Sequence, residues 1–373
     1  MLDLSAAFDT IDHSILLRRL QTCFNITGDA LSWIKSYLTG RYQCVSVNKL
    51  YSTDVLLTCG VPQGSVLGPL LFSLYMTPLS EIAKRFNVLY HFYADDSQLY
   101  VSFNPKENVS LENLESCISS IKSWMQVNML KLNDGKTEFI VFASRHSLST
   151  LDKVPLHIGS VEIDPCDKVR NLGAMFDSTL SMEAFVNDKI KSCIFYLCCI
   201  HRIRRFLTLD AAKHLVYAYV ISRLDYANSL LSGANKGLIH KLQVVQNSAA
   251  RLVFGAKRFA HATPLLRSLH WLPIEQRIAF KINTLTFKCL HDLAPIYLSN
   301  LIEWYTPGRS LRSSNSSLLS CHRSNNSYGS RSFCNYAPVM WNALPLDLRS
   351  SQSLIQFRKS LKTFLFGQYF DSK

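Results

Sequence analysis

The sequence predicts an α+β domain with helices on one face of an antiparallel sheet, followed by a mostly helical region. In the first 180 residues, short strand-like segments alternate with amphipathic helical ones. Residues 181–300 instead carry apolar side chains at helical spacing. Because 48% of the 373 residues are hydrophobic, the chain can bury a sizeable core and is not a disordered tail.

The elements of the first half follow from their patterns in order. Residues 2–4 read as the end of a strand, and residues 9–24 have helical periodicity, with Asp9 or Thr10 as the N-cap. After a second helix at 29–38, a hairpin (41–48 with 53–59) and a turn at 60–64, Ser65 can cap a third helix. The remaining expected elements are a hairpin of 88–93 with 97–103, a helix at 111–132, and strands at 138–143, 154–163 and 169–176.

The distribution of charge along the chain is more informative than the net charge of +13. Residues 1–180 hold 15 Lys and Arg against 18 Asp and Glu, a net charge of −3. Residues 181–373 hold 25 against 9, a net charge of +16. Because such a basic excess is typical of proteins that bind anions, the second half predicts nucleic acid as its partner, ahead of a membrane surface.

Targeting and redox signals indicate a reducing compartment, the nucleus or the cytoplasm. The N-terminus lacks the charged start and apolar core of a signal peptide, and no apolar run approaches the roughly 18–20 residues of a membrane span. The 11 cysteines include no Cys-x-x-Cys pair, so we expect reduced, buried thiols, with Cys198 and Cys199 among them. A zinc site at Cys321, His322 and Cys334 would lack a fourth ligand.

Three aspartates are expected to meet at one edge of the predicted sheet. Asp3 ends the first strand, and Asp95 and Asp96 occupy the corner of a hairpin that would pair beside it. Carboxylates gathered in this way suit two divalent ions roughly 3.5–4 Å apart, an arrangement that serves phosphoryl transfer. The alternative is that Asp-Asp is an ordinary hairpin corner, since turns favour Asp, and that Asp3 is unrelated to it.

Five segments, in the right order, resemble the motifs of a known polymerase family. DLSAAFDTIDH (residues 3–13), GVPQGSVLGP (60–69) and FYADD (92–96) resemble palm motifs A, B and C of reverse transcriptases. LKLNDGKTE (130–138) and VRNLG (169–173) resemble the next two motifs of non-LTR (LINE-type) retrotransposons, the second being the primer grip. The resemblance implies a right-hand polymerase palm over residues 1–176, without fingers, followed by a mostly α-helical thumb and C-terminal region.

The resemblance also implies a metal site. Asp3 and Asp95 would be the principal ligands of two Mg²⁺ ions, for which Mn²⁺ could substitute, and Asp96 would be a weaker ligand or an electrostatic support. Lys136 would lie near the pyrophosphate leaving group as a general acid, although a solvated surface lysine is an equally open reading. Asp9 and Asp12 are taken as residues of the helix start rather than ligands.

Three further residues would contact the nucleotide. Phe8 matches the steric gate that excludes a ribose 2′-OH and so selects deoxynucleotides; its alternative is a core aromatic. Gln63 and Gly64 match the turn that contacts the incoming nucleotide and the template, and their alternative is an ordinary Pro-Gln-Gly turn.

The basic half resembles, in position, the thumb that holds the template–primer duplex by its phosphates. Arg170 lies in the primer-grip segment. The candidate phosphate-binding residues of the second half are Arg202, Arg204, Arg205, Arg251, Lys257 and Arg258. The alternative is a solvated helix face.

The sequence also predicts how the second half is divided. We expect a thumb-like region at 177–304, a linker rich in Ser, Asn and Arg at 305–336, and a C-terminal extension at 337–373.

The resemblance implies an RNA-directed DNA polymerase that joins deoxynucleoside triphosphates to a DNA primer on an RNA template. Because only Met1 and Leu2 precede Asp3, we expect a truncated copy with impaired activity. The competing hypothesis is a non-catalytic nucleic-acid-binding remnant, and a third is a chain with no stable role. The sequence predicts no oligomeric state.

Overall fold

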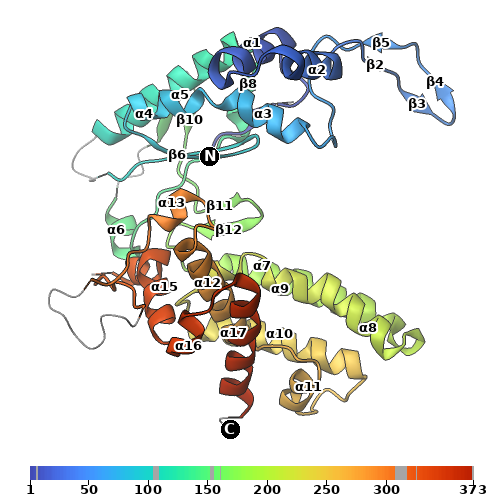
Figure 1. The fold of residues 1–373 in the computed structure, drawn as a ribbon, viewed down its shortest axis with the longest axis vertical. Helices are drawn as coiled ribbons and strands as arrows, with labels where there is room; N and C mark the ends of the chain where they lie inside the picture. Colours follow the sequence, from blue (N-terminus) through green and yellow to red (C-terminus); the bar gives the residue numbers. More distant parts are fainter. Residues whose placement is uncertain are drawn as a thin grey trace. The chain divides into compact units, whose positions relative to one another are not determined.

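The computed structural model describes residues 1–5, 7–103, 109–151, 155–159, 161–306, 317–324 and 326–371 (Figure 1). The chain divides into two units, Met1–Leu172 and Gly173–Lys373. Helices and small antiparallel strand pairs make up the first unit, and helices dominate the second. The predicted α+β class is therefore confirmed, whereas the names palm and thumb remain predictions.

The first unit contains two short antiparallel strand pairs that adjoin through one bridge. β1 (Leu4–Ser5) pairs with β8 (Lys131–Leu132), and β6 (Leu89–Tyr93) pairs with β7 (Asp96–Tyr100). Just before β1, the backbone of Leu2 exchanges two hydrogen bonds with that of Ser97 in β7, with N···O distances of 2.8 and 3.4 Å. The strands therefore follow one another in the order β8, β1, β7, β6.

Helices pack over these strands, and Figure 1 shows α1, α3, α4 and α5 grouped on one side of β6. The helices of this unit are α1 (His13–Phe24), α2 (Gly28–Leu38), α3 (Gly68–Met76), α4 (Leu79–Arg85), α5 (Val109–Val127) and α6 (Arg145–Thr150). Their buried side chains, such as Leu16, Phe72 and Ile121, form the core of the unit. Arg19 of α1 lies 4.7 Å from the ring centre of Tyr75 in α3, so a cation–π contact joins these two helices.

An exposed hairpin between α2 and α3 confirms the pattern of residues 41–59. β2 (Tyr42–Gln43) pairs with β5 (Val55–Leu56), and β3 (Ser46–Val47) pairs with β4 (Leu50–Tyr51). Every residue from 41 to 56 is exposed. Backbone pairing rather than burial therefore holds this hairpin.

Two predicted helix boundaries are wrong. The N-cap of α1 is Asp12, whose carboxylate accepts a hydrogen bond from the Ile15 amide at 2.9 Å, and not Asp9 or Thr10. The helix predicted to reach residue 132 ends at Val127, because Met129 adopts a left-handed φ of +56° that α-helix cannot continue through.

The last three strands predicted in the first half also differ from the structure. The strand expected at 138–143 is only a single bridge, between Phe139 and Pro165. The strand expected at 154–163 is a hairpin of β9 (Leu156–Ile158) and β10 (Val161–Ile163), turned at Gly159 with φ +64°; residues 154 and 160 lie outside the described residues.

The strand expected at 169–176 is likewise two strands, β11 (Lys168–Asn171) and β12 (Ala174–Asp177). Leu172 and Gly173 separate them, with φ values of +44° and +76°. Alternating apolar residues marked the strands correctly, but positive-φ turns inside the runs divide them.

The second unit confirms the helical region predicted for residues 181–300. Its helices are α7 (Glu183–Ile203), α8 (Leu209–Val216), α9 (Ser222–Asp225), α10 (Lys236–Phe254), α11 (Ala262–Ser268), α12 (Ile274–Leu290), α13 (Ile296–Ser299), α14 (Ser327–Arg331), α15 (Phe333–Asn342), α16 (Leu346–Arg349) and α17 (Leu354–Phe370). Short 3₁₀ turns follow α7 (η2, Arg204–Phe206) and precede α10 (η4, Asn228–Leu231), and a π-helical segment, η3 (Tyr217–Ile221), continues α8. In the parts of the chain that the structure describes, no helix combines the length and the apolar character that crossing a bilayer requires.

Part of the segment predicted as a linker is helical. Within 305–336, α14 and the start of α15 are formed, and residues 307–316 and 325 lie outside the described residues. The Asn326 side chain accepts a hydrogen bond from the Gly329 amide at 2.6 Å and caps α14. Asn is as typical of a helix N-cap as of a loop, which explains why composition alone pointed to a loop.

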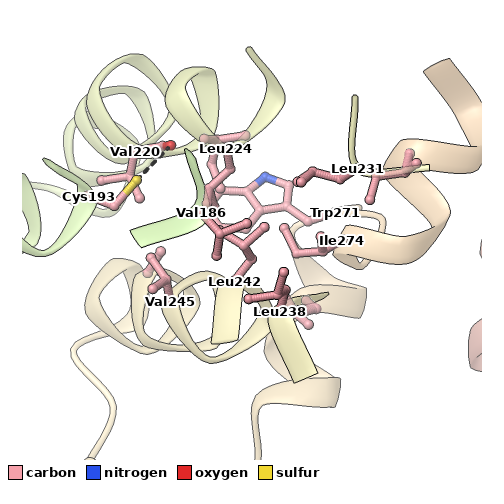
Figure 2. Packing of buried hydrophobic residues seen from close by; sticks show 14 of the residues in the cluster. Val186, Cys193, Val220, Leu224, Leu231, Leu238, Leu242, Val245, Trp271 and Ile274 are labelled. Carbon is pink, nitrogen blue, oxygen red and sulfur yellow. Dashed lines mark hydrogen bonds between the residues drawn. The ribbon is translucent and has the colours of Figure 1, made fainter. Parts of the chain in front are cut away.

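The core of the second unit surrounds a buried tryptophan. Figure 2 shows Trp271 among Val186 of α7, Leu224 of α9 and Leu242 of α10. All eleven cysteines are free thiols, as predicted, but Cys198 and Cys199 are exposed rather than buried. Both lie on α7, whose buried face is formed by other positions.

The buried Lys189 of α7 is the most unusual ionisable group of this unit. The side chain is 7% exposed, and its ammonium nitrogen donates to the backbone carbonyls of Arg223 and Tyr226. The same nitrogen lies 4.6 Å from the ring centre of Phe185. Burial lowers the pKa of Lys189 from 10.5 to about 8. A neutral amine still has two N–H groups, which is enough to satisfy both carbonyls.

We expect Lys189 to make stability depend on pH between about 8 and 10.5. In this window the unfolded chain holds the proton and the folded chain releases it, so the free energy of unfolding rises with pH, by about 3 kcal/mol in all. Denaturant titrations at pH 7 and pH 10 should show this rise in the wild type, relative to Lys189→Met. The exposed Lys191→Met is the matched control and should behave as the wild type. An equal change in the free energy of unfolding between pH 7 and pH 10 for Lys189→Met and the wild type would contradict the lowered pKa of Lys189.

Candidate active site

The Asp95-Asp96 pair lies at a tight turn between two antiparallel strands. Tyr93 pairs with Asp96, so Ala94 and Asp95 form a two-residue turn between β6 and β7. Ala94 has φ +52°, a conformation that an L side chain rarely adopts. The hairpin corner expected from the sequence is confirmed, and it holds both carboxylates half-buried.

The residues just before β1 bring Asp3 to the same edge. Leu2, one residue earlier, pairs with Ser97, one residue after Asp96. On the other side, the amide of Asn133 donates to the carbonyl of Asp3 at 2.9 Å. The backbone of Asp3 is therefore held between the Asp95-Asp96 turn and the segment after β8.

The Asp96 carboxyl is both half-buried and close to like charges. Burial, and then the negative charges of Asp95 and Asp3, raise the pKa of the Asp96 carboxyl above its usual value. The charge of Asp3 therefore reaches Asp96, although more than 90 positions separate these two residues in the chain. Of these side chains, Asp3 has a nearby cation: the Lys136 ammonium lies 3.8 Å from its Oδ2.

The backbone position of Lys136 is fixed by the ion pair of Asp134, two residues earlier, rather than by contacts of the Lys136 side chain. It ends the 3₁₀ turn η1 (Asp134–Lys136), and Asp134 forms a 2.8 Å ion pair with Lys122 of α5. The Lys136 side chain itself is 72% exposed. Both readings of this residue, a catalytic acid and a surface lysine, therefore remain compatible with its position.

The donor set suits a hard divalent cation, since such ions prefer carboxylate oxygens, and a cation would offset both the burial of Asp96 and the like charges beside it, which together raise its pKa. In the described residues, however, no three His, Cys, Asp or Glu side chains are arranged as a ready ligand set. Asp3, Asp95 and Asp96 share an edge but are not converged on one point.

The turn at Gly60 is joined to the segment after Asp3 by backbone hydrogen bonds. The Gly60 amide donates to the Ile11 carbonyl at 2.8 Å, and the Val61 amide donates to the Phe8 carbonyl at 2.9 Å. Gly60 has φ +85°, and a Cβ at this position would lie 2.9 Å from the Asp9 carbonyl oxygen. Glycine is therefore required here both for conformation and for close approach.

The side chains of this junction show contacts that the sequence did not predict. Gln63 donates from Nε2 to both carboxylate oxygens of Asp9, at 2.9 and 3.1 Å, and His13 Nε2 lies 2.7 Å from the Gly60 carbonyl oxygen. Asp9 and His13 therefore position the Gln63 turn. The only signal in the sequence was their place inside the first motif.

Gly64 and Phe8 occupy different environments. Gly64 is exposed, with φ +77° and open space where a Cβ would stand. The Phe8 ring is half-buried, 4.6 Å from the ring centre of Phe72 in α3. This contact is the packing that a core aromatic would make, and it also fixes the orientation of the ring.

The predicted phosphate-binding residues fall into two groups. Arg204 donates to the backbone carbonyls of Leu207, Leu252 and Val253 at 2.7–2.9 Å, so its guanidinium is engaged within the protein. Arg251 is half-buried and donates from Nε to the Ala260 carbonyl at 2.8 Å. The exposed members of the set are Arg170 on β11 and Arg202, Arg205, Lys257 and Arg258 in the second unit.

Comparison with known proteins agrees with the motifs. Residues 1–176 match the family described as reverse transcriptase (RNA-dependent DNA polymerase). The chain is 28% identical over 291 residues to a probable RNA-directed DNA polymerase from transposon BS of Drosophila melanogaster. It is 26% identical over 289 residues to one from transposon X-element and 24% identical over 277 residues to the RNA-directed DNA polymerase from mobile element jockey, both of the same fly.

These three matches cover 72–74% of this chain and 29–31% of each relative. The chain thus spans less than a third of the length of these relatives. Because the matched share of this chain exceeds residues 1–176, the similarity also extends into the second unit. The five ordered motifs and these matches agree: residues 1–176 match the reverse transcriptase family, and the chain is similar to RNA-directed DNA polymerases of non-LTR retrotransposons.

Proposed function

We propose that the chain catalyses RNA-directed DNA synthesis, the extension of a DNA primer by deoxynucleoside triphosphates on an RNA template. The observation that carries the proposal is the pairing of Leu2 with Ser97, which places Asp3 beside the Asp95-Asp96 turn. The match of residues 1–176 to the reverse transcriptase family supports the reaction type. The metal site, the nucleotide contacts and the substrates are parts of the proposal.

Asp3 and Asp95 would hold a pair of divalent cations, Mg²⁺ or Mn²⁺, with Asp96 as a weaker ligand. When bound, such cations neutralise the charge that develops on the attacking and leaving oxygens in nucleotidyl transfer. Lys136, beside Asp3, would donate a proton to the departing pyrophosphate. In this proposal the fixed backbone of Asp3 keeps its carboxylate in place, since positioning supplies much of the rate in phosphoryl transfer.

The junction around Gly60 would receive the incoming nucleotide and the template base. Gln63 and Gly64 lie at its exposed tip, and the hydrogen bonds from Gln63 to Asp9 hold the tip in one conformation. Phe8 would stand under the sugar of the nucleotide, with Phe72 behind the ring to prevent it from moving aside.

The exposed cations of the second unit would bind the phosphates of the template–primer, with Arg170 as a further contact from β11. The proposal uses Arg202, Arg205, Lys257 and Arg258, since Arg204 is engaged by backbone carbonyls. If the palm chemistry is absent, the same cations, within a segment of net charge +16, support the second candidate function: nucleic-acid binding without catalysis.

Primer extension tests the catalytic proposal. With Mg²⁺, an RNA template and a DNA primer, we expect synthesis by the wild type and a fall of at least about 100-fold for Asp95→Asn, because the substituted amide cannot neutralise a metal ion. Glu162→Gln, an exposed carboxylate on β10, should extend primers as the wild type does. RNA binding without extension, unchanged by Asp95→Asn and independent of Mg²⁺, would support the non-catalytic alternative.

The choice between the two readings of Phe8 follows from nucleotide selection. If Phe8 is the gate, Phe8→Val should increase incorporation of ribonucleotides relative to deoxynucleotides by at least about tenfold, since a smaller side chain leaves room for the 2′-OH. Steady-state kinetics with each nucleotide would measure this ratio. A lower melting temperature with an unchanged ratio would assign Phe8 to the core alone.

Salt titrations separate phosphate contacts from structural arginines. Arg205→Gln should lower the slope of log Kobs against log salt by about one unit, because one phosphate contact is lost. Arg204→Gln should leave the slope unchanged but lower the melting temperature, because three carbonyl partners lose their donor. Fluorescence anisotropy with a labelled RNA–DNA hybrid measures the slope. Equal slopes for Arg205→Gln and the wild type would remove Arg205 from the binding surface.

A further inference from the structure

Two tripeptides of the second unit share one pattern: two basic residues followed by phenylalanine. They are Arg204-Arg205-Phe206 and Lys257-Arg258-Phe259. The first forms η2 at the end of α7, and the second lies in the turn that follows α10. Neither phenylalanine is used by the core or by the function proposed above.

Both phenylalanine rings are unusually exposed. Phe206 is 74% exposed and Phe259 is 88% exposed, against 61% for the next most exposed phenylalanine, Phe195. Leaving such rings in water forgoes the free energy that burial of their apolar surface would supply. Exposed aromatic rings on a basic surface are candidates for stacking against unpaired bases.

Hydrogen bonds hold the two tripeptides at the same end of the helical unit. Arg204 donates to the carbonyls of Leu252 and Val253, in the last turn of α10, and so fixes η2 against that helix end. Three residues after α10, the second tripeptide begins, and Arg251 donates to the Ala260 carbonyl to fold this turn back. Figure 1 shows the C-terminal ends of α7 and α10, which lead into α8 and α11, on the same side of the second unit.

Each ring carries a guanidinium beside it. The Arg205 guanidinium carbon lies 4.6 Å from the ring centre of Phe206, and that of Arg258 lies 5.8 Å from the ring centre of Phe259. Planar guanidinium groups and aromatic rings are both surfaces on which an unpaired base can stack.

The electrostatic surroundings favour a polyanion. No Asp or Glu occurs from residue 189 to 209 or from 251 to 274, the two segments that contain the tripeptides. Asp210, the first acid after η2, has the His214 imidazole 3.3 Å away. Arg202 and Lys257 add two exposed cations to the same segments.

We propose that this end of the second unit, which we call the Arg–Phe tip (Arg205, Phe206, Arg258 and Phe259), binds single-stranded nucleic acid by stacking unpaired bases on its rings. Cations beside the rings bind the phosphates of the same strand. A duplex cannot use the rings in this way, because its bases already stack on each other. The proposal rests on the affinity of the second unit for nucleic acid, and it does not depend on the carboxylate chemistry.

The test measures single-strand affinity by fluorescence anisotropy on the full chain. The probes are a labelled 20-nucleotide oligo(dT), the same length of abasic strand, and a duplex of equal length. For the double variant Phe206→Leu/Phe259→Leu, we expect at least a tenfold loss of affinity for oligo(dT), since the aliphatic side chains offer no ring on which a base can stack. Affinity for the duplex and for the abasic strand should be unchanged, and so should the salt slope, because no phosphate contact is lost.

Phe195→Leu on α7 is the matched control, since it removes an exposed ring elsewhere on the same unit and should keep full affinity. An unchanged affinity of the double variant for oligo(dT), or an equal loss on duplex and abasic strands, would overturn the stacking site while leaving phosphate binding intact. A wild type that binds none of the three probes would overturn both. Ring-dependent binding to vesicles of phosphatidylcholine and phosphatidylserine, without binding to oligo(dT), would assign the tip to a membrane surface and overturn the proposal.

Discussion

The candidate active site depends on one short stretch of backbone pairing, between Leu2 and Ser97. Leu2 and Leu4 are 4% and 6% exposed, so the alternation of the strand directs the intervening Asp3 to the opposite face from the core. Burying two leucines contributes about 1.5–3 kcal/mol each, and the backbone hydrogen bonds add about 1 kcal/mol each. These contributions offset the cost of holding Asp96 half-buried and close to the charges of Asp95 and Asp3, which raise its pKa.

Local sequence patterns predicted the hairpin that carries Asp95 and Asp96, but not the long-range contacts that fix the Gln63 turn. Asp-Asp between two aromatic-rich strands is a strong hairpin signal, and the hairpin is present. The pair formed by Gln63 and Asp9 joins positions 54 residues apart, and nothing in either local segment signals it. The N-cap of α1 could not be chosen from the local sequence either. Asp9 and Asp12 are both residue types that suit an N-cap, and only the fold shows that Asp12 takes the role.

Charge in a sequence likewise does not distinguish arginines that hold the fold from those that face a partner. Arg204 and Arg205 are adjacent, yet one closes the last carbonyls of α10 and the other lies in solvent. The two arginines differ because the final carbonyls of a helix have no donors within the helix, and Arg204 is the one placed to donate to them. An arginine that folds back on such an end is lost to phosphate binding, but it fixes the residues beside it.

The engagement of Arg204 by backbone carbonyls also favours the proposed Arg–Phe tip. A phenylalanine on a mobile loop would lose conformational entropy each time it stacked on a base, whereas a ring on an anchored turn has already lost that entropy during folding. Arg204 and Arg251 supply the anchors from within the protein, which leaves Arg205 and Arg258 free to act at the surface. Residues 1–180 carry a net charge of −3, which by itself disfavours the binding of phosphates there. Under the proposed function, retention of a strand would depend mainly on the basic second unit, where stacking of unpaired bases on the Arg–Phe tip would be less sensitive to salt than phosphate contacts are.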